Sequence, residues 1–230
     1  MPITEAMRAR HMVRKYTDKP LPADIVEKLQ ERIDGLNAEH DVKIALALQN
    51  TDGFSPAIKL VLAKGVRNFF VMAGPDDVTV DERLGYCGAE LMLLAQELGL
   101  NTWWVGGTFS RKGASAVVDA SAKVVGIVAV GYCATQGVPH KTKAPSDVAA
   151  YKVAAGDAVA AESEWPAWFS EGVEAALLAP TALAKQSFEI TGEGNAVRIT
   201  CDNGIFTGVD LGLVRYHFEQ GAGRENFTWV

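Results

Sequence analysis

The sequence predicts an α+β fold in which helices cover a central mixed or antiparallel sheet. Three observations favour it: short apolar runs bounded by Gly, Asn and Pro, longer segments with apolar residues at helical spacing, and a hairpin pattern followed by one more helix. Hydrophobic residues make up 48% and charged residues 22% of the 230 residues, as in ordinary globular proteins. We expect a single domain over residues 1–230, with possible halves at 1–150 and 151–230.

Four segments have the apolar periodicity of helices. Residues 21–37 begin with Pro22, which suits a first helical turn, and repeat apolar side chains from Ile25 to Leu36. Residues 81–100 predict a central core helix with Gly99 near its C-terminus. Two further helices are expected at 165–178 and 209–220.

The expected strands lie between these helices. Residues 42–49, 66–74 and 122–133 are apolar and rich in β-branched side chains, and 101–110 predict a strand that breaks into a glycine turn. We expect 101–110 and 122–133 to lie side by side. Residues 187–201 predict a hairpin that turns at 192–195. The polar stretch 134–160 is the expected boundary between the halves.

Composition and motifs exclude several classes of protein. A net charge of -6 disfavours binding to nucleic acid or to an anionic membrane. The first residues contain no apolar run typical of a signal peptide, so we expect a cytoplasmic protein. The three cysteines form no CxxC pair, and no HExxH is present, so we expect no metal. Dinucleotide and nucleoside-triphosphate loop motifs are absent as well.

Two basic segments indicate a local anion site in this acidic chain. The first, "RARHMVRK", carries Arg8, Arg10, His11, Arg14 and Lys15. The second, "PHKTKAP" at 139–145, follows directly after the strand at 122–133. Loops at strand ends often bind ligands, and phosphate needs several charge-assisted donors. Solvated surface charge remains the alternative for each segment alone.

The stretch "RHMVRKYTDKPLP" at 10–22 resembles the opening of the nitroreductase-like flavoprotein family. The resemblance implies a nitroreductase-like fold that binds flavin mononucleotide (FMN), with Arg10, Lys141 and Lys143 on the phosphate and Arg14 at the pyrimidine edge. His11 would belong to the same cofactor-binding segment. Met12 stands where the family usually has Ser, so one hydroxyl contact is missing or replaced by a backbone N–H.

Two more stretches extend the resemblance. Residues 85–107 are similar to the family's central helix and following strand, which implies that Val105, Gly106 and Gly107 lie against the flavin ring near N5. Residues 177–190 are similar to its Ala-Pro-Ser-x-x-Asn-x-Gln-Pro segment. In that segment Pro180 and Gln186 match, Thr181 keeps the hydroxyl, Ala184 replaces the Asn and Ser187 replaces the second Pro.

The order of these segments departs from the usual family pattern. In most members the Ala-Pro-Ser segment follows soon after the N-terminal basic motif and reaches the flavin of a partner subunit, whereas here it lies near the C-terminus. The resemblance therefore implies a rearranged relative whose second half imitates the partner. Such a chain acts as a monomeric pseudo-dimer or as a homodimer.

The resemblance implies an FMN-dependent oxidoreductase driven by NAD(P)H. Hydride would pass in a ping-pong scheme through flavin N5 to a small electron-poor acceptor of the nitroaromatic or quinone type, with no catalytic side chain required. Phe109, just beyond the glycines, is the expected substrate contact. The alternative is a catalytically idle carrier or sensor that binds flavin or another phosphate ligand, which Met12 and Ala184 make plausible.

Overall fold

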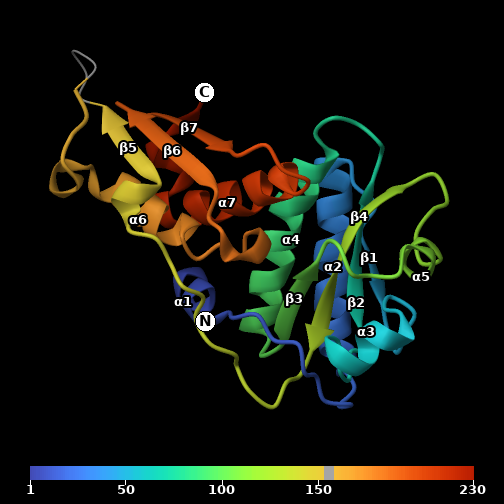
Figure 1. Cartoon of the computed structure of the whole chain (residues 1–230). Helices are drawn as coiled ribbons and strands as arrows, with labels where there is room; N and C mark the ends of the chain where they lie inside the picture. Colours follow the sequence, from blue (N-terminus) through green and yellow to red (C-terminus); the bar gives the residue numbers. More distant parts are fainter. Residues whose placement is uncertain (153–157) are drawn as a thin grey trace.

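The first half of the chain builds an antiparallel sheet with the strand order β1-β2-β4-β3 (Figure 1). The structure is a computed structural model that describes residues 1–152 and 158–230. The strands are β1 (Ala45–Ala47), β2 (Phe69–Gly74), β3 (Asn101–Val105) and β4 (Lys123–Gly131). The segment after the first helix runs along the β3 edge, where Met12 forms a parallel bridge to Thr102.

Helices cover both faces of this sheet. The long helices α2 (Ala23–His40) and α4 (Val80–Glu97) share one core with alternate residues of β2 and β4, such as Phe70 and Val128. The opposite face carries a second core around Phe69 and Ile127. The short helices α3 (Pro56–Val61) and α5 (Arg111–Ser115) lie beside that second core, and α1 (Ile3–Ala9) packs against α4.

The second half forms its own mixed sheet, with the order β5-β6-β7-β8. The strands are β5 (Ala149–Lys152), β6 (Phe188–Glu193), β7 (Ala196–Cys201) and β8 (Thr228–Trp229). The β6–β7 pair is antiparallel, whereas β5 and β8 pair parallel to their neighbours. The helices α6 (Ala167–Ala176) and α7 (Thr207–Ala222) pack on each other and lie between this sheet and α4 (Figure 1).

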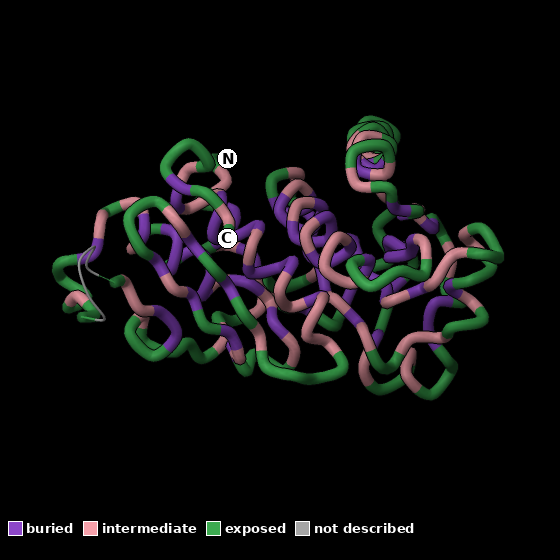
Figure 2. The backbone as a smooth tube through the Cα atoms, turned by 90° about the horizontal axis from the view of Figure 1, so that it is seen from above, coloured by how far each residue is buried: buried purple, intermediate pink, exposed green. Residues whose placement is uncertain are grey.

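One apolar core extends through both halves. It runs from Leu29 on α2 and Met92 on α4 to Val214 on α7 and Phe169 on α6, and on to Ile190 in the second sheet. Figure 2 shows buried backbone in both halves of the molecule, with exposed residues at the periphery. Burial of this shared apolar surface links the stability of one half to that of the other.

Glycines bring α4 and α7 into backbone contact. A Cβ added at Gly212 would lie 2.0 Å from the carbonyl oxygen of Glu82, and one added at Gly85 would lie 2.2 Å from the carbonyl oxygen of Val209. Real Cβ atoms do not approach so closely, so these two positions accept only glycine at this helix separation. The contact fixes the position of α7 relative to the first sheet.

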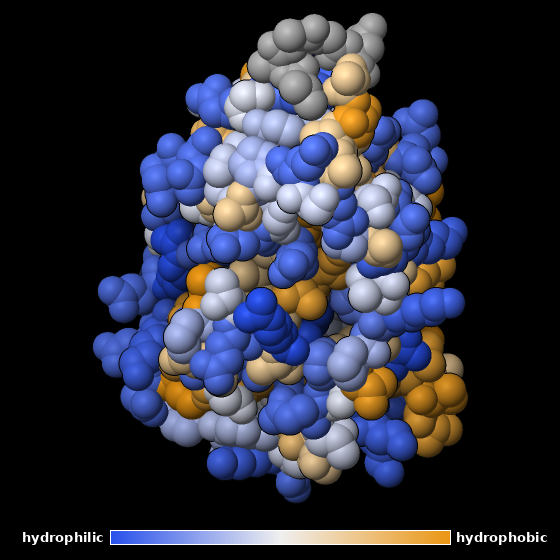
Figure 3. Space-filling view, turned by 90° about the vertical axis from the view of Figure 1, so that its left-hand side faces the viewer, coloured by the Kyte–Doolittle hydropathy of each residue, from blue (hydrophilic) through white to orange (hydrophobic). Residues whose placement is uncertain are grey.

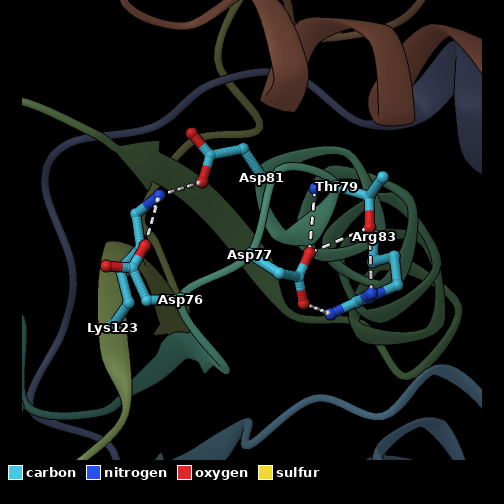
Figure 4. A network of polar contacts seen from close by, with 6 residues as sticks. All are labelled: Asp76, Asp77, Thr79, Asp81, Arg83 and Lys123. Carbon is cyan, nitrogen blue, oxygen red and sulfur yellow. Dashed lines mark hydrogen bonds and ion pairs between the residues drawn. The ribbon is translucent and has the colours of Figure 1, made fainter.

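An ion-pair network anchors the start of α4 (Figure 4). Arg83 donates to Asp77 at 2.7 Å, and the Thr79 N–H donates to the same carboxylate at 2.9 Å. The Lys123 Nζ lies 3.1 Å from Asp81 and 3.4 Å from Asp76. Hydrogen bonds from Arg83 and from Thr79 lower the pKa of Asp77 to about 2. The network joins the β2–α4 turn to the first residue of β4.

Hydrophilic side chains dominate the face shown in Figure 3, and hydrophobic ones gather in small groups between them. Among the helices of the described residues, none is long and apolar enough to cross a membrane.

The predicted helices and strands agree well with the structure, but the sheet organisation differs. The helices expected at 21–37, 81–100, 165–178 and 209–220 correspond to α2, α4, α6 and α7. The expected single central sheet is instead two four-stranded sheets, because the 187–201 hairpin pairs with β5 and β8 and not with the first sheet. The predicted polar boundary 134–160 contains β5, and its residues 153–157 lie outside the described residues.

We predict that Gly212→Ala destabilises the protein by about 1–3 kcal/mol or more, because the new Cβ collides with the α4 backbone. Gly35→Ala in α2 is the matched control: its Cβ would meet the movable ends of the Arg32 and Glu39 side chains and no backbone of another element, and alanine favours the helix by up to about 1 kcal/mol. Urea unfolding of both variants tests this. Equal stability of the two variants would show that α4 and α7 do not depend on the glycine contact.

Candidate functional site

Arg10 is a buried cation that has no acidic partner among the described residues. It follows α1 as its C-terminal cap residue and is only 4% exposed. Its Nε has no hydrogen-bond partner among the described residues, and no ion pair to it is found there. Burial lowers the pKa of Arg10 to about 10, and the nearby Tyr16 offsets this slightly. A buried charge of this kind is costly unless an anion accompanies it.

The loop after β4 reaches the Arg10 segment. Gly137, with φ +76, lies so close to this segment that an added Cβ would be 2.8 Å from the Met12 carbonyl oxygen and 3.1 Å from the His11 Cβ. Burial lowers the pKa of His11, and the charges of Arg10 and His140 lower it further. The two basic segments that the sequence singles out therefore meet in space.

Gln186 connects this loop to the 177–186 segment. Its side chain is 1% exposed, its Oε1 accepts the Lys143 N–H at 2.8 Å, and its Nε2 donates to the Leu177 carbonyl at 2.8 Å. The Lys143 Nζ donates to the Gln186 carbonyl at 2.9 Å. His140 Nε2 lies 3.2 Å from Gln186 Nε2 and 3.0 Å from the Leu177 carbonyl. The Gln186 N–H in turn donates to the buried Thr181 hydroxyl at 3.2 Å.

The remaining predicted contacts of the basic segments are more exposed. Met12 is 48% exposed at the β3 edge. The Arg14 guanidinium lies over the Trp103 ring, 5.1 Å from its centroid, and Lys141 is exposed in the loop. Lys143 also lines a polar cavity of about 400 Å³ whose walls include Asp147 and Asp202.

An aromatic side chain of the second half lies against the glycines that end β3. A Cβ added at Gly106 would be 2.5 Å from the Phe206 ring, and one at Gly107 would be 3.9 Å from it. Val105 is buried at the end of β3. Phe109, the predicted substrate contact, packs against the second core, with the Arg111 guanidinium 5.2 Å from its ring centroid. The ring at these glycines is therefore that of Phe206, which precedes the helix expected at 209–220 and caps α7.

The 180–186 segment is strained and is held by Asp210. Leu183, Ala184 and Gln186 adopt positive φ angles of 54°, 53° and 50°, which cost free energy in residues other than glycine. The Asp210 carboxylate accepts the Ala182 N–H at 2.9 Å. Burial raises the pKa of Asp210 to about 6, although this hydrogen bond opposes the shift. Pro180, half-buried, begins the segment, and such strain often accompanies ligand sites.

His217 is a second buried polar group near Arg10, and nothing in the sequence assigns it a functional role. It is fully buried on α7, and its Nδ1 lies 2.8 Å from the Leu213 carbonyl. Its Nε2 has no partner among the described residues. Burial lowers the pKa of His217 to about 3, and the charges of Arg10 and His140 contribute to the shift.

No clustered metal ligands stand out in the part of the chain that the structure describes: no three His, Cys, Asp or Glu side chains there could hold an ion together. The distinctive feature is instead a group of cationic and neutral donors around Arg10, drawn from both halves. The group around Arg10 can bind an anion, and the glycines that end β3 form a separate edge against which the Phe206 ring packs.

Comparison with models of protein families shows to which family the chain belongs. The family model described as "Putative TM nitroreductase" matches residues 2–222. The chain belongs to this nitroreductase family. Among the curated proteins, no sequence matches it. The resemblance seen in the basic segments thus leads to the correct family.

One solved structure shares the fold of this family member over almost the whole chain, and two others align with part of it. A nitroreductase of Thermotoga maritima superposes with a TM-score of 0.70 at 19% identity, covering 98% of this chain and 85% of its own. A nitroreductase family protein of Streptococcus pneumoniae gives 0.50 at 11% identity, over 63% and 97%. A nitroreductase of Desulfovibrio desulfuricans, solved in complex with FMN, gives 0.49 at 16% identity, over 64% and 95%.

We predict that His217 makes folding stability fall as the pH is lowered. The unfolded chain binds a proton at His217 below about pH 6.5, but the folded chain binds it only near pH 3, so acid favours unfolding within this window. Asp210 acts in the opposite direction between its ordinary pKa of 3.8 and about 6.

Urea unfolding of wild type and His217→Gln across the same pH range isolates the histidine, because the Asp210 contribution is common to both proteins. We expect the difference in unfolding free energy to shift in favour of the variant as the pH falls below about 6.5. A difference that is constant with pH would contradict the assignment.

Proposed function

We propose that this family member is an FMN-dependent oxidoreductase, driven by NAD(P)H, that reduces a small electron-poor acceptor of the nitroaromatic or quinone type. Arg10 is the observation that carries the cofactor assignment. Its buried guanidinium has an Nε without a partner in the described residues, so it needs an anion, and the phosphate of FMN supplies one.

The surrounding residues fit a phosphorylated ligand with a flat ring. In this proposal Arg10 holds the phosphate, and His11 and Lys141 add donors from the two basic segments that meet beside it. Gly106 and Gly107, next to the buried Val105, offer a backbone edge without side chains to the flavin ring, beside the Phe206 ring that packs against Gly106.

The chain's own residues orient the ligand and adjust its charge. When bound, FMN supplies the redox chemistry, taking hydride from NAD(P)H and passing it to the acceptor. Arg14, held over Trp103, supplies a cation that stabilises negative charge on the pyrimidine edge. Pro180, Thr181 and Gln186 form a wall from the second half, positioned by Asp210 and Lys143.

A single chain contributes every one of these groups. Arg10 comes from the first half and Gln186 from the second, and the 137–143 loop contacts both through His140 and Lys143. We infer that the second half takes the place of a partner subunit, so that the protein functions as a monomeric pseudo-dimer or as a homodimer of complete sites.

The test is an absorbance spectrum after reconstitution with FMN and desalting. We predict that Arg10→Met weakens FMN binding by about 10-fold to 100-fold, because a charge-assisted contact to phosphate is lost, and leaves riboflavin binding unchanged. Arg8→Ala, an exposed arginine of α1, is the matched control and keeps wild-type affinity. Undiminished FMN affinity in Arg10→Met would refute the phosphate assignment.

Turnover separates the enzyme from the idle carrier. We expect the FMN-loaded protein to oxidise NAD(P)H when a quinone or a nitroaromatic compound is present. A protein that retains FMN but consumes no NAD(P)H with any such acceptor would instead be a flavin carrier or sensor.

A further inference from the structure

Arg10 and His217 come from opposite halves of the chain, and the charge of Arg10 acts on the buried His217 ring. Arg10 caps α1, His217 lies on α7, and these two helices are in contact. Both residues are buried: Arg10 is 4% exposed and His217 is 0% exposed. Each also carries one nitrogen without a partner among the described residues.

The hydrogen bond of His217 fixes which nitrogen holds the proton. Because Nδ1 lies 2.8 Å from the Leu213 carbonyl, which can only accept, Nδ1 carries the hydrogen. The neutral ring therefore presents an unprotonated Nε2. A buried acceptor left unpaired costs about 1–3 kcal/mol, so the site is incomplete without a ligand that satisfies it.

Two charged groups among the described residues lower the pKa of His217. They are Arg10 and His140, and the same two groups act on His11. Tyr16 lies near Arg10, and the Tyr216 ring centroid is 6.3 Å from that of His217. Among the described residues, the charged groups that shift the pKa of His217 include no carboxylate. An anion at Arg10 would therefore add a negative charge near this ring, and it would favour protonation of Nε2.

We propose that the phosphomonoester bound at Arg10 is held together with one additional proton shared with His217 Nε2. Either Nε2–H donates to a phosphate oxygen, or a P–OH group donates to Nε2, and both arrangements contain the same number of protons. The inference rests on the proposed function in using its phosphate site, but it concerns the charge state of that site and involves no redox step.

The proposal fixes a pH dependence. The second pKa of a phosphomonoester is about 6, so near pH 8 the free ligand is a dianion and the proton must come from solvent. Binding then takes up one proton, and Kd rises about tenfold per pH unit. Near pH 5 the ligand already carries the proton, so the uptake from solvent falls toward zero.

The experiment is calorimetric titration of the full chain with FMN near pH 8, in buffers of different ionisation enthalpy. We expect an uptake approaching one proton in wild type and in His40→Asn, a control on α2, and none in His217→Gln. Binding without uptake would overturn the proposal, as would uptake that survives in His217→Gln and is lost in His140→Asn.

Two further measurements keep the test decisive. If His217→Gln fails to fold, ¹⁵N NMR of wild type reports on the ring directly: Nε2 gains a hydrogen-bonded proton when ligand is added, and an unchanged ring overturns the proposal.

Titration with inorganic phosphate separates this proposal from the flavin assignment. Phosphate binding with proton uptake, in a protein that does not bind FMN, supports the His217 site and refutes the flavin function, whereas no binding of either ligand refutes both.

Discussion

The backbone contact between α4 and α7 at Gly85 and Gly212 determines the geometry of the rest of the molecule. This contact sets where α7 lies along α4, and so it sets the positions of two side chains of the proposed site. Phe206, at the start of α7, reaches the glycines that end β3, and His217 reaches the neighbourhood of Arg10. The two residues are separated by about three helical turns, roughly 16 Å along the axis. In the proposed site, α7 therefore connects the ring end, at Phe206, with the anion end, at His217.

Buried charge is the second organising feature. The chain carries a net charge of -6, yet the groups around Arg10 are cationic or neutral. Burying a guanidinium without an acid lowers stability, and the extensive apolar core shared by both halves offsets that cost. Strain at Leu183, Ala184 and Gln186 adds to the cost at the same site. A protein tolerates such costs where a ligand uses them, and in this proposal the ligand accounts for the unpaired nitrogens of Arg10 and His217 and for the positive φ angles of Leu183, Ala184 and Gln186.

The sequence predicted local structure well because periodicity and turn residues report on local physics. Helix α2 and the β6–β7 hairpin follow directly from apolar spacing and from the turn near Gly194. The sequence also indicated that the two basic segments lie close together, since each of them adjoins a predicted helix or strand. Phe206, Asp210 and His217 could not be assigned to the site, because their neighbours lie about 30 to 200 residues away in the chain.

The sequence did not predict the separation into two sheets, because this separation too depends on contacts between residues far apart in the chain. The pattern of the hairpin at 187–201 predicts two paired strands, but it does not specify the strands beside them. The parallel pairing of β6 with β5 and of β7 with the two-residue β8 is a tertiary feature without a local signal. Phe109 lies just beyond the glycines, which suggested a substrate contact. The structure shows its ring half-buried against the second core, around Phe69 and Ile127, and the substrate contact stays a prediction.

The most direct test of the account is a crystal structure of the protein grown with FMN. The account predicts the phosphate within hydrogen-bond distance of the Arg10 guanidinium, in a pocket closed by residues of both halves of one chain. A flavin phosphate bound elsewhere, with the Nε of Arg10 still unpaired, would contradict it. A pocket completed by a second copy of the chain would contradict the single-chain site.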